Sequence, residues 1–181
     1  AATDKGAAPY TVTLYNERLK DMSYGAGYTA KITKNGVAAS DVTTSALTNG
    51  TLTVTWTLDA IGQSARDFAY TIGGLNLGTV GATISGFSVT ASNNTNVVLG
   101  NAVSLTITNT DASATFKGSD GQTVPGGYLW KGTATVDGHQ TAILDGKLSS
   151  DSRVITTSFY PLVPNGVTYT VAGTDWINPG V

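Results

Sequence analysis

Threonine occupies every second position of one segment of this chain, Thr51-Leu52-Thr53-Val54-Thr55-Trp56-Thr57-Leu58. Successive side chains of a β-strand point to opposite faces of its sheet, so the apolar residues here share one face and the threonines share the other. The same rhythm returns at 10–15, 103–108 and 167–171. The alternation therefore predicts half-buried β-strands from one end of the chain to the other.

Turn dipeptides separate these segments at short intervals. Asn-Gly and Asp-Gly favour tight hairpin turns, because both residue types tolerate the positive φ angles that such turns require. The pairs are Asn35-Gly36, Asn49-Gly50, Gly73-Gly74, Asp120-Gly121, Asp137-Gly138, Asp145-Gly146 and Asn165-Gly166. The strands expected between them are 10–16, 27–34, 37–47, 51–59, 67–73, 82–91, 97–109, 112–117, 127–136, 139–144, 153–160 and 166–172.

About 9–12 short strands with almost no helix indicate an all-β fold, an antiparallel β-sandwich or a jelly-roll-like domain of immunoglobulin-like or pilin-like type. We expect residues 1–16 to form a flexible N-terminal lead and a candidate donor strand, and residues 17–181 to form a single β-sandwich domain. The predicted core contains Ile32, Leu52, Val54, Trp56, Leu58, Phe68, Tyr70, Ile72, Phe87, Val89, Val103, Leu105, Ile107, Phe116, Val154 and Tyr169.

The low content of charged residues argues against some classes of binding partner. Charged residues make up 12% of the chain and the formal net charge is -2, so neither a nucleic acid nor direct insertion into a membrane is expected. The chain has no cysteine, and it opens on small residues, Ala1-Ala2, as a secreted product does after its signal peptide is removed. We therefore expect an extracellular or cell-surface location.

No catalytic motif stands out. His139 is the only histidine, in the turn segment Asp137-Gly138-His139-Gln140, and no Gly-x-Ser-x-Gly nucleophile turn accompanies it. Eleven of the acidic residues are aspartates that lie mostly in predicted turns, where their short side chains bind nearby backbone. The sequence predicts no enzyme activity, no catalytic residues, no metal site and no cofactor.

Two kinds of residue are candidates for modification or for sugar binding. Asn49 and Asn93 each begin an Asn-x-Thr sequence in a predicted turn or loop, and both are candidate glycosylation sites. Trp130 and Trp176 are candidate sugar-stacking aromatics if they are exposed, although packing of Trp130 in the core is the competing interpretation.

The strand near the N-terminus offers the sharpest functional hypothesis. Tyr10, Val12 and Leu14 form an apolar face that either packs in its own domain or is donated to the sheet of a neighbouring copy. This segment, Tyr10–Tyr15, and the run Pro125-Gly126-Gly127-Tyr128-Leu129-Trp130-Lys131-Gly132-Thr133-Ala134-Thr135-Val136 resemble parts of extracellular β-sandwich fibre subunits of the donor-strand type, the bacterial or archaeal pilins.

This resemblance implies a structural subunit of a pilus-like filament, with copies of the same chain as head-to-tail partners. Two other classes of protein are alternatives to a filament subunit. A carbohydrate-binding or adhesin module would bind host or matrix glycans, and a viral or phage jelly-roll protein would form or decorate a closed shell.

Overall fold

The computed structural model describes residues 10–24, 28, 31–34, 37–38, 43–56, 69–71, 76–138, 140–164 and 166–180. These residues form fifteen β-strands and one short 3-10 turn, η1 (Glu17–Leu19), which confirms the all-β class. The chain divides into two compact units, Ala1–Leu75 and Asn76–Val181, where a single sandwich over 17–181 had been expected. Each sheet is built from strands of one unit only, which explains the division.

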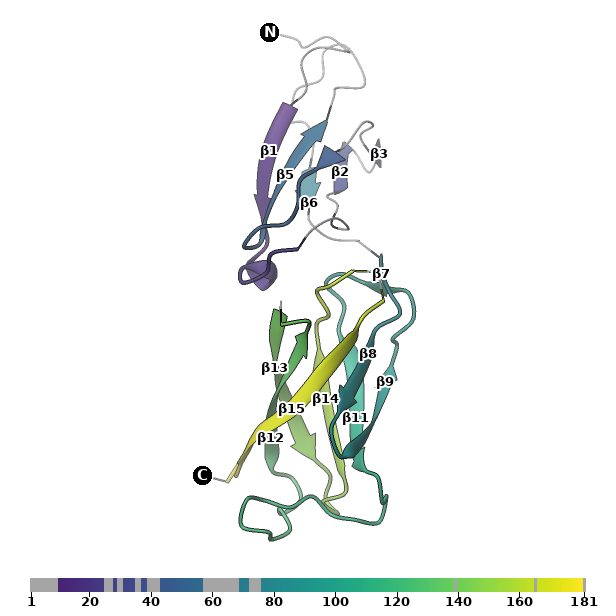
Figure 1. Cartoon of the computed structure of the whole chain (residues 1–181), viewed down its shortest axis with the longest axis vertical. Coiled ribbons are helices and arrows are strands. Elements are labelled where there is room, and N and C mark those ends of the chain that lie inside the picture. The colour runs from purple at the N-terminus through teal and green to yellow at the C-terminus, as the bar shows by residue number, and fades with distance from the viewer. Residues whose placement is uncertain are drawn as a thin grey trace. The chain divides into compact units, whose positions relative to one another are not determined.

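The first unit contains two three-stranded antiparallel sheets, of order β1-β5-β4 and β3-β2-β6 (Figure 1). Their strands are β1 (Tyr10–Tyr15), β2 (Lys31–Lys34), β3 (Val37–Ala38), β4 (Thr43–Thr44), β5 (Thr51–Trp56) and β6 (Ala69–Thr71). The alternation in β5 buries Leu52, Val54 and Trp56, as predicted. Asn49 and Gly50 both have positive φ angles and lie between the paired Thr48 and Thr51, so the predicted hairpin turn is confirmed.

The second unit is built around one seven-stranded sheet of order β8-β15-β12-β13-β14-β11-β9, accompanied by the small pair β10-β7. The strands are β7 (Asn76–Gly78), β8 (Gly81–Ile84), β9 (Phe87–Ser92), β10 (Val97–Val98), β11 (Val103–Asn109), β12 (Leu129–Val136), β13 (Gln140–Leu148), β14 (Val154–Phe159) and β15 (Thr168–Ile177). All neighbours in the large sheet are antiparallel except β8 and β15, which run parallel.

The large sheet is nearly a barrel. Its two edge strands, β8 and β9, follow each other in the chain and are joined by a turn at Ser85 and Gly86, so the sheet curls until its edges lie near each other (Figure 1). The interior is filled by fully buried side chains, among them Leu105, Ile107, Leu144, Leu148 and Tyr169. The Tyr169 hydroxyl accepts hydrogen bonds from the backbone N–H groups of Leu162 and Val163, at 2.8 and 3.1 Å.

Three local expectations are wrong. Residues 112–117 form no strand and make only an isolated bridge between Lys117 and Thr123. Asp145-Gly146 lies inside β13 rather than in a turn. In β14 the buried side chain is Ile155, while Val154 is half-buried, so the inward face is opposite to the predicted one.

The rest of the predicted core divides into four groups. Val103, Leu105, Ile107, Phe116 and Tyr169 are buried as predicted, whereas Phe87 and Val89 are half-buried. Leu58, Phe68 and Ile72 lie outside the described residues, and the side chains of Ile32 and Tyr70 are not described.

Candidate interaction sites

β1 is an edge strand of its sheet. It pairs with β5 along its whole length, which places Tyr10 opposite Trp56, Val12 opposite Val54 and Leu14 opposite Leu52. The Tyr10 and Trp56 rings lie 5.8 Å apart between centroids. Although the three partners on β5 are almost completely buried, the apolar side chains of β1 are only half-buried. The apolar face of β1 is therefore incompletely covered within one chain.

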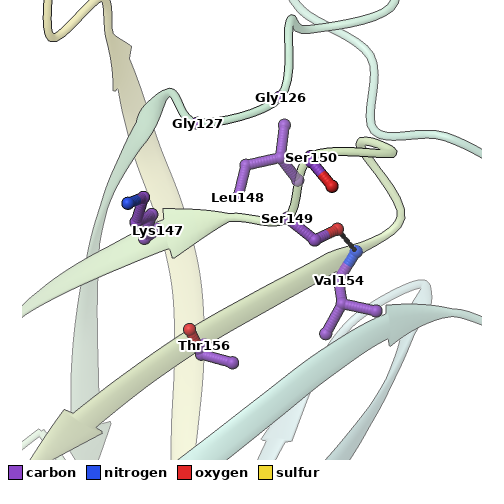
Figure 2. Close-up of a pocket in the computed structure, with 8 residues that line it drawn as sticks. All are labelled: Gly126, Gly127, Lys147, Leu148, Ser149, Ser150, Val154 and Thr156. Carbon is purple, nitrogen blue, oxygen red and sulfur yellow. Dashed lines mark hydrogen bonds between the residues drawn. The ribbon is translucent and has the colours of Figure 1, made fainter.

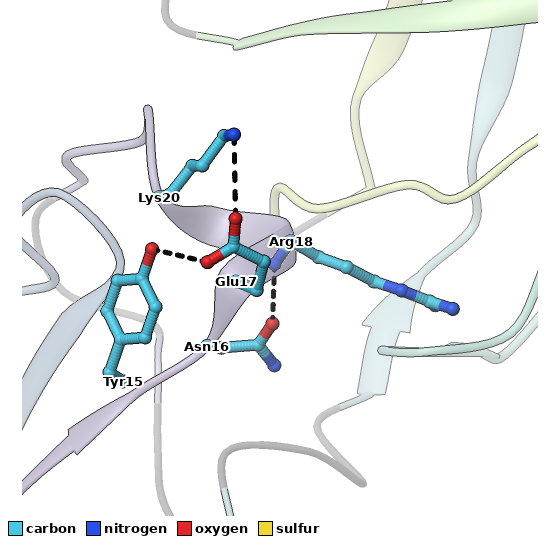
Figure 3. A network of polar contacts seen from close by, with 5 residues as sticks. All are labelled: Tyr15, Asn16, Glu17, Arg18 and Lys20. Carbon is cyan, nitrogen blue, oxygen red and sulfur yellow. Dashed lines mark hydrogen bonds and ion pairs between the residues drawn. The ribbon is translucent and has the colours of Figure 1, made fainter.

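A polar network lies where β1 ends (Figure 3). The Tyr15 hydroxyl donates a hydrogen bond of 2.8 Å to Glu17, and the Lys20 ammonium lies 3.5 Å from the other oxygen of that carboxylate. The hydrogen bond from Tyr15, followed by the charge of Lys20, lowers the pKa of Glu17, and the same hydrogen bond raises the pKa of Tyr15. All three side chains are exposed, so the network stabilises this end of β1 only weakly.

The backbone after β1 is held more firmly than the exposed network. The Asn16 N–H donates a 3.0 Å hydrogen bond to the Gly50 carbonyl, and the Asn16 side chain caps η1 by accepting from the Arg18 N–H. Leu19 and Met22 are completely buried directly afterwards. Asn16 is therefore the point at which the edge strand joins the fixed part of the first unit.

A shallow hollow of about 380 Å³ in the second unit lies between Gly126, Gly127 and the turn that follows β13 (Figure 2). Ser149 in this hollow is committed to the turn, because its hydroxyl donates to Asp151 at 2.6 Å and accepts from the Val154 N–H at 3.0 Å. The hydrogen bond from Ser149 lowers the pKa of Asp151. No base among the described residues that line the hollow faces this hydroxyl, so the arrangement is that of a structural turn.

The two candidate glycosylation sites differ in the hydrogen bonds that their side-chain amides make. Both asparagines are exposed and have positive φ angles. Asn93 donates from Nδ2 to the Ala102 carbonyl at 2.8 Å and accepts from the Ser104 N–H at 3.2 Å. Asn49 is held through its Oδ1, which accepts from the Ser23 hydroxyl at 3.4 Å. A glycan on Asn93 would take one of the two Nδ2 hydrogens that can make its bond to Ala102, whereas the bond between Asn49 and Ser23 uses Oδ1, so Asn49 is the better acceptor by geometry.

The two candidate sugar-stacking residues occupy adjacent positions on β12 and β15. Trp130 pairs with Trp176, but Trp130 is only 4% exposed while Trp176 is half-buried. The Trp130 ring is enclosed by Gly132, Gly146 and Gly173 from three neighbouring strands. Gly132 lies inside an expected strand, Asp145-Gly146 was expected to form a turn, and Gly173 follows the last expected strand. No local pattern at these three positions indicates contact with a tryptophan ring.

Other classes of site gain no support from the described part of the chain. No group of three or more His, Asp or Glu side chains within it is placed to hold a metal ion, and His139 lies outside it. Among the same residues, no helix has the length and apolar character needed to cross a membrane. No family model, curated protein or solved structure matches the chain.

Proposed function

We propose that this chain is a structural subunit of an extracellular filament, in which copies join head to tail by exchanging β1. The observation that carries the proposal is the position of β1 at the edge of the sheet β1-β5-β4 with its apolar face half-covered. A strand whose contacts are mostly with one neighbouring strand can make the same contacts with another copy at little cost.

The acceptor in this scheme is β5. Without β1, the edge of β5 and the side chains of Leu52, Val54 and Trp56 would lose their cover. A β1 strand from a second copy restores the same six residue pairs, including Val12 with Val54. The exchange therefore conserves the register and requires no new interface.

The segment that follows β1 is fixed in its own unit, so β1 is the part of the chain that can be exchanged. Asn16 has an extended backbone and precedes a segment that the buried Leu19 and Met22 fix in place. A change of direction at Asn16 would redirect β1 toward another copy while η1 and β5 stay where they are. Each copy then donates one strand and accepts one, and such a head-to-tail contact generates a filament when it does not close into a ring.

The amino-acid composition suits a structural subunit of a filament outside the cell. The sparse charge and the hydroxyl-rich strand faces, such as Thr51, Thr53 and Thr55 of β5, give a surface that changes little with salt or with pH near neutrality. Occupying the free edge of β5 also prevents the uncontrolled pairing that exposed edge strands invite.

The test uses the absence of cysteine from the chain. Thr11 and Thr55 lie opposite each other in β1 and β5, with their hydroxyl oxygens 3.2 Å apart. When the single variants Thr11→Cys and Thr55→Cys are mixed, a disulfide between these two positions forms only between copies. We expect covalent dimers of mixed composition on a non-reducing gel under conditions in which electron microscopy shows filaments.

The double variant Thr11→Cys/Thr55→Cys supplies the complementary measurement. A disulfide formed within the monomer locks β1 onto its own β5, so filaments should fail to form until a reductant is added. Thr90→Cys, at an exposed threonine of β9, replaces Thr11→Cys in the control mixture and reports random collisions. Filaments from the locked monomer, or mixed dimers no more abundant than in the control, would refute strand exchange.

A further inference from the structure

One end of the near-barrel in the second unit is hollowed into a cleft of about 450 Å³, within the range of small-molecule sites. We call it the end cleft and define it by Phe87, Asn109, Phe116, Lys117, Trp130 and Trp176. These residues come from β9, β11, β12, β15 and the connection between β11 and β12. Mouths of β-barrels are common places for ligand sites, because the strand ends surround a space that the core does not fill.

The base of the end cleft contains Trp130. A Cβ atom on Gly132 would lie 2.4 Å from its ring, one on Gly173 would lie 2.8 Å from its Nε1, and one on Gly146 would lie 3.0 Å from its ring. A side chain at Gly132 or Gly173 would collide with the indole, and one at Gly146 would be tightly packed against it. The indole is only 4% exposed, so it closes the inner end of the cleft.

Aromatic rings form one wall. Phe87 and Phe116 are stacked, with centroids 5.1 Å apart and planes 12° apart, and Trp176 meets Phe116 edge to face at 5.9 Å. Trp176 follows a register shift in β15, where Gly132 pairs with Gly173 but Lys131 pairs with Asp175. The irregularity redirects the end of β15, as bulges beside binding sites do. Trp176 is half-buried, so part of its ring borders the open space.

The remaining lining mixes the apolar Ile84 and Ile155 with polar side chains, and its formal charge is close to zero. Asn109 donates to the Ala114 carbonyl at 3.1 Å, and its Oδ1 accepts no hydrogen bond from the described residues. Lys117 is the one basic residue of the lining and Asp175 the one acidic residue. The Lys117 ammonium already donates to Thr123 at 2.9 Å. This lining does not provide the concentrated positive charge that an anionic ligand requires.

We propose that the end cleft binds a neutral saccharide, one pyranose ring of which lies against Trp176 and the neighbouring phenylalanines. A pyranose has an apolar C–H face that packs on aromatic rings, and its hydroxyl groups both donate and accept hydrogen bonds. They can bind Asn109 and Thr115 of the lining, where the Thr115 hydroxyl also shares a 2.9 Å hydrogen bond with Thr123. A purely apolar ligand would bury the Asn109 Oδ1, which accepts no hydrogen bond from the described residues, without offering it a donor. All of these residues belong to the second unit, so the site does not depend on exchange of β1.

The chain has three tryptophans, and their indole N–H signals in a ¹H–¹⁵N NMR spectrum report the site directly. The probes are the methyl pyranosides of glucose, galactose and mannose, titrated to about 50 mM so that millimolar binding is detected. For at least one of them, the Trp176 and Trp130 signals should shift in a saturable way, while that of Trp56, which is not part of the lining, should stay in place.

Trp176→Ala should weaken the binding by about tenfold or more, as expected when an aromatic stacking surface is truncated. Tyr160→Ala is the matched control, because Tyr160 is a 43% exposed aromatic residue of the same unit outside the lining, and it should leave binding unchanged. The Trp130 signal verifies that the second unit of each variant is folded. The proposal is overturned if no neutral pyranoside shifts these signals, if Trp176→Ala binds normally, or if methyl glucuronide, an acidic probe, binds more tightly.

Discussion

At the scale of single residues, the best-defined feature of the second unit is the enclosure of Trp130 by glycines. The ring is almost completely buried although it lies near one end of the sheet. Gly132 also approaches the Ala172 carbonyl, which a Cβ atom would meet at 2.8 Å. Because that oxygen belongs to the backbone of the paired strand β15, it cannot move aside as a flexible side chain would.

Gly132→Ala should therefore lower the free energy of unfolding of the second unit by about 1–3 kcal/mol, the cost of overpacking a filled core. Gly81→Ala is the matched control within the same sheet, since its added methyl group meets only the Thr168 side chain at an ordinary 3.4 Å. Urea denaturation of both variants, followed by tryptophan fluorescence, measures the difference. Equal stabilities would contradict the tight packing of Trp130 on Gly132.

Two exposed aspartates make the second unit sensitive to acid. The Ser113 hydroxyl and N–H donate to Asp111, and the Ser149 hydroxyl donates to Asp151, which lowers the pKa of both carboxyl groups. A lowered pKa in the folded state contributes stability above the ordinary pKa of about 4, and this contribution is lost as the pH falls through the folded-state value.

The melting temperature of the second unit should thus be level near neutral pH and should fall as the pH drops below about 4. Asp151→Asn and Ser149→Ala should each reduce this fall, because the first removes the titrating carboxyl group and the second removes the hydrogen bond that lowers its pKa. Circular dichroism melts between about pH 7 and pH 2.5 test the expectation. Identical acid profiles for the two variants and the unchanged chain would show that the hydrogen bond does not form in solution.

Two dipeptides of similar composition, Asp145-Gly146 and Asn49-Gly50, adopt different structures. Asp145-Gly146 has the composition of a turn, yet Gly146 lies within β13 beneath Trp130. At Asn49-Gly50 the same kind of dipeptide does form a turn with positive φ angles. Gly50 permits a positive φ angle in a turn, whereas Gly146 makes room for the Trp130 ring, yet both glycines follow a typical turn residue in the sequence. The two roles are distinguished only by the pairing of β12 with β13, which places Gly146 opposite Trp130.

At the scale of elements, β1 combines one half-covered face with one exposed face, and the two respond differently to charge. Val12→Glu places a carboxylate opposite the buried Val54, which should lower the free energy of unfolding of the first unit by about 2 kcal/mol and should prevent filament formation. Thr13→Glu adds the same charge on the exposed face and should change stability by less than about 0.5 kcal/mol.

Chemical denaturation and electron microscopy of these two variants give the comparison. If Thr13→Glu is as harmful as Val12→Glu, then overall charge on β1, rather than its apolar face, controls assembly. If neither variant affects stability, β1 does not pair with β5 in solution.

The alternation of side chains predicted some strands better than others. In β5, threonine and apolar residues strictly alternate, so one assignment of faces is favoured and it is correct. In β14, Val154 and Ile155 are adjacent and both apolar, and the following residues are small and polar. The sequence pattern therefore does not show whether Val154 or Ile155 points into the core. Strand pairing determines this, because Ile155 lies opposite the inward Ile107 of β11.

At the scale of the whole molecule, the all-β class was predictable but the division after Leu75 was not. Class follows from local alternation and turn residues, which both units share. A boundary between units is visible in sequence only if composition changes or a linker intervenes, and Ile72-Gly73-Gly74-Leu75 resembles any other turn of this chain. The parallel pairing of β8 with β15 joins residues distant in sequence, so no local pattern indicates it.

Because the second unit has its own sheets and its own core, residues 76–181 produced without the first unit should fold independently. Its amide NMR signals should coincide with those of the same residues in the whole chain, except close to residue 76. This fragment lacks β1 and β5, so it should form no filaments, yet it should bind the same pyranoside as the whole chain. A folded fragment that binds no sugar bound by the whole chain would show that the end cleft needs the first unit, and a fragment that forms filaments would show that assembly does not use β1.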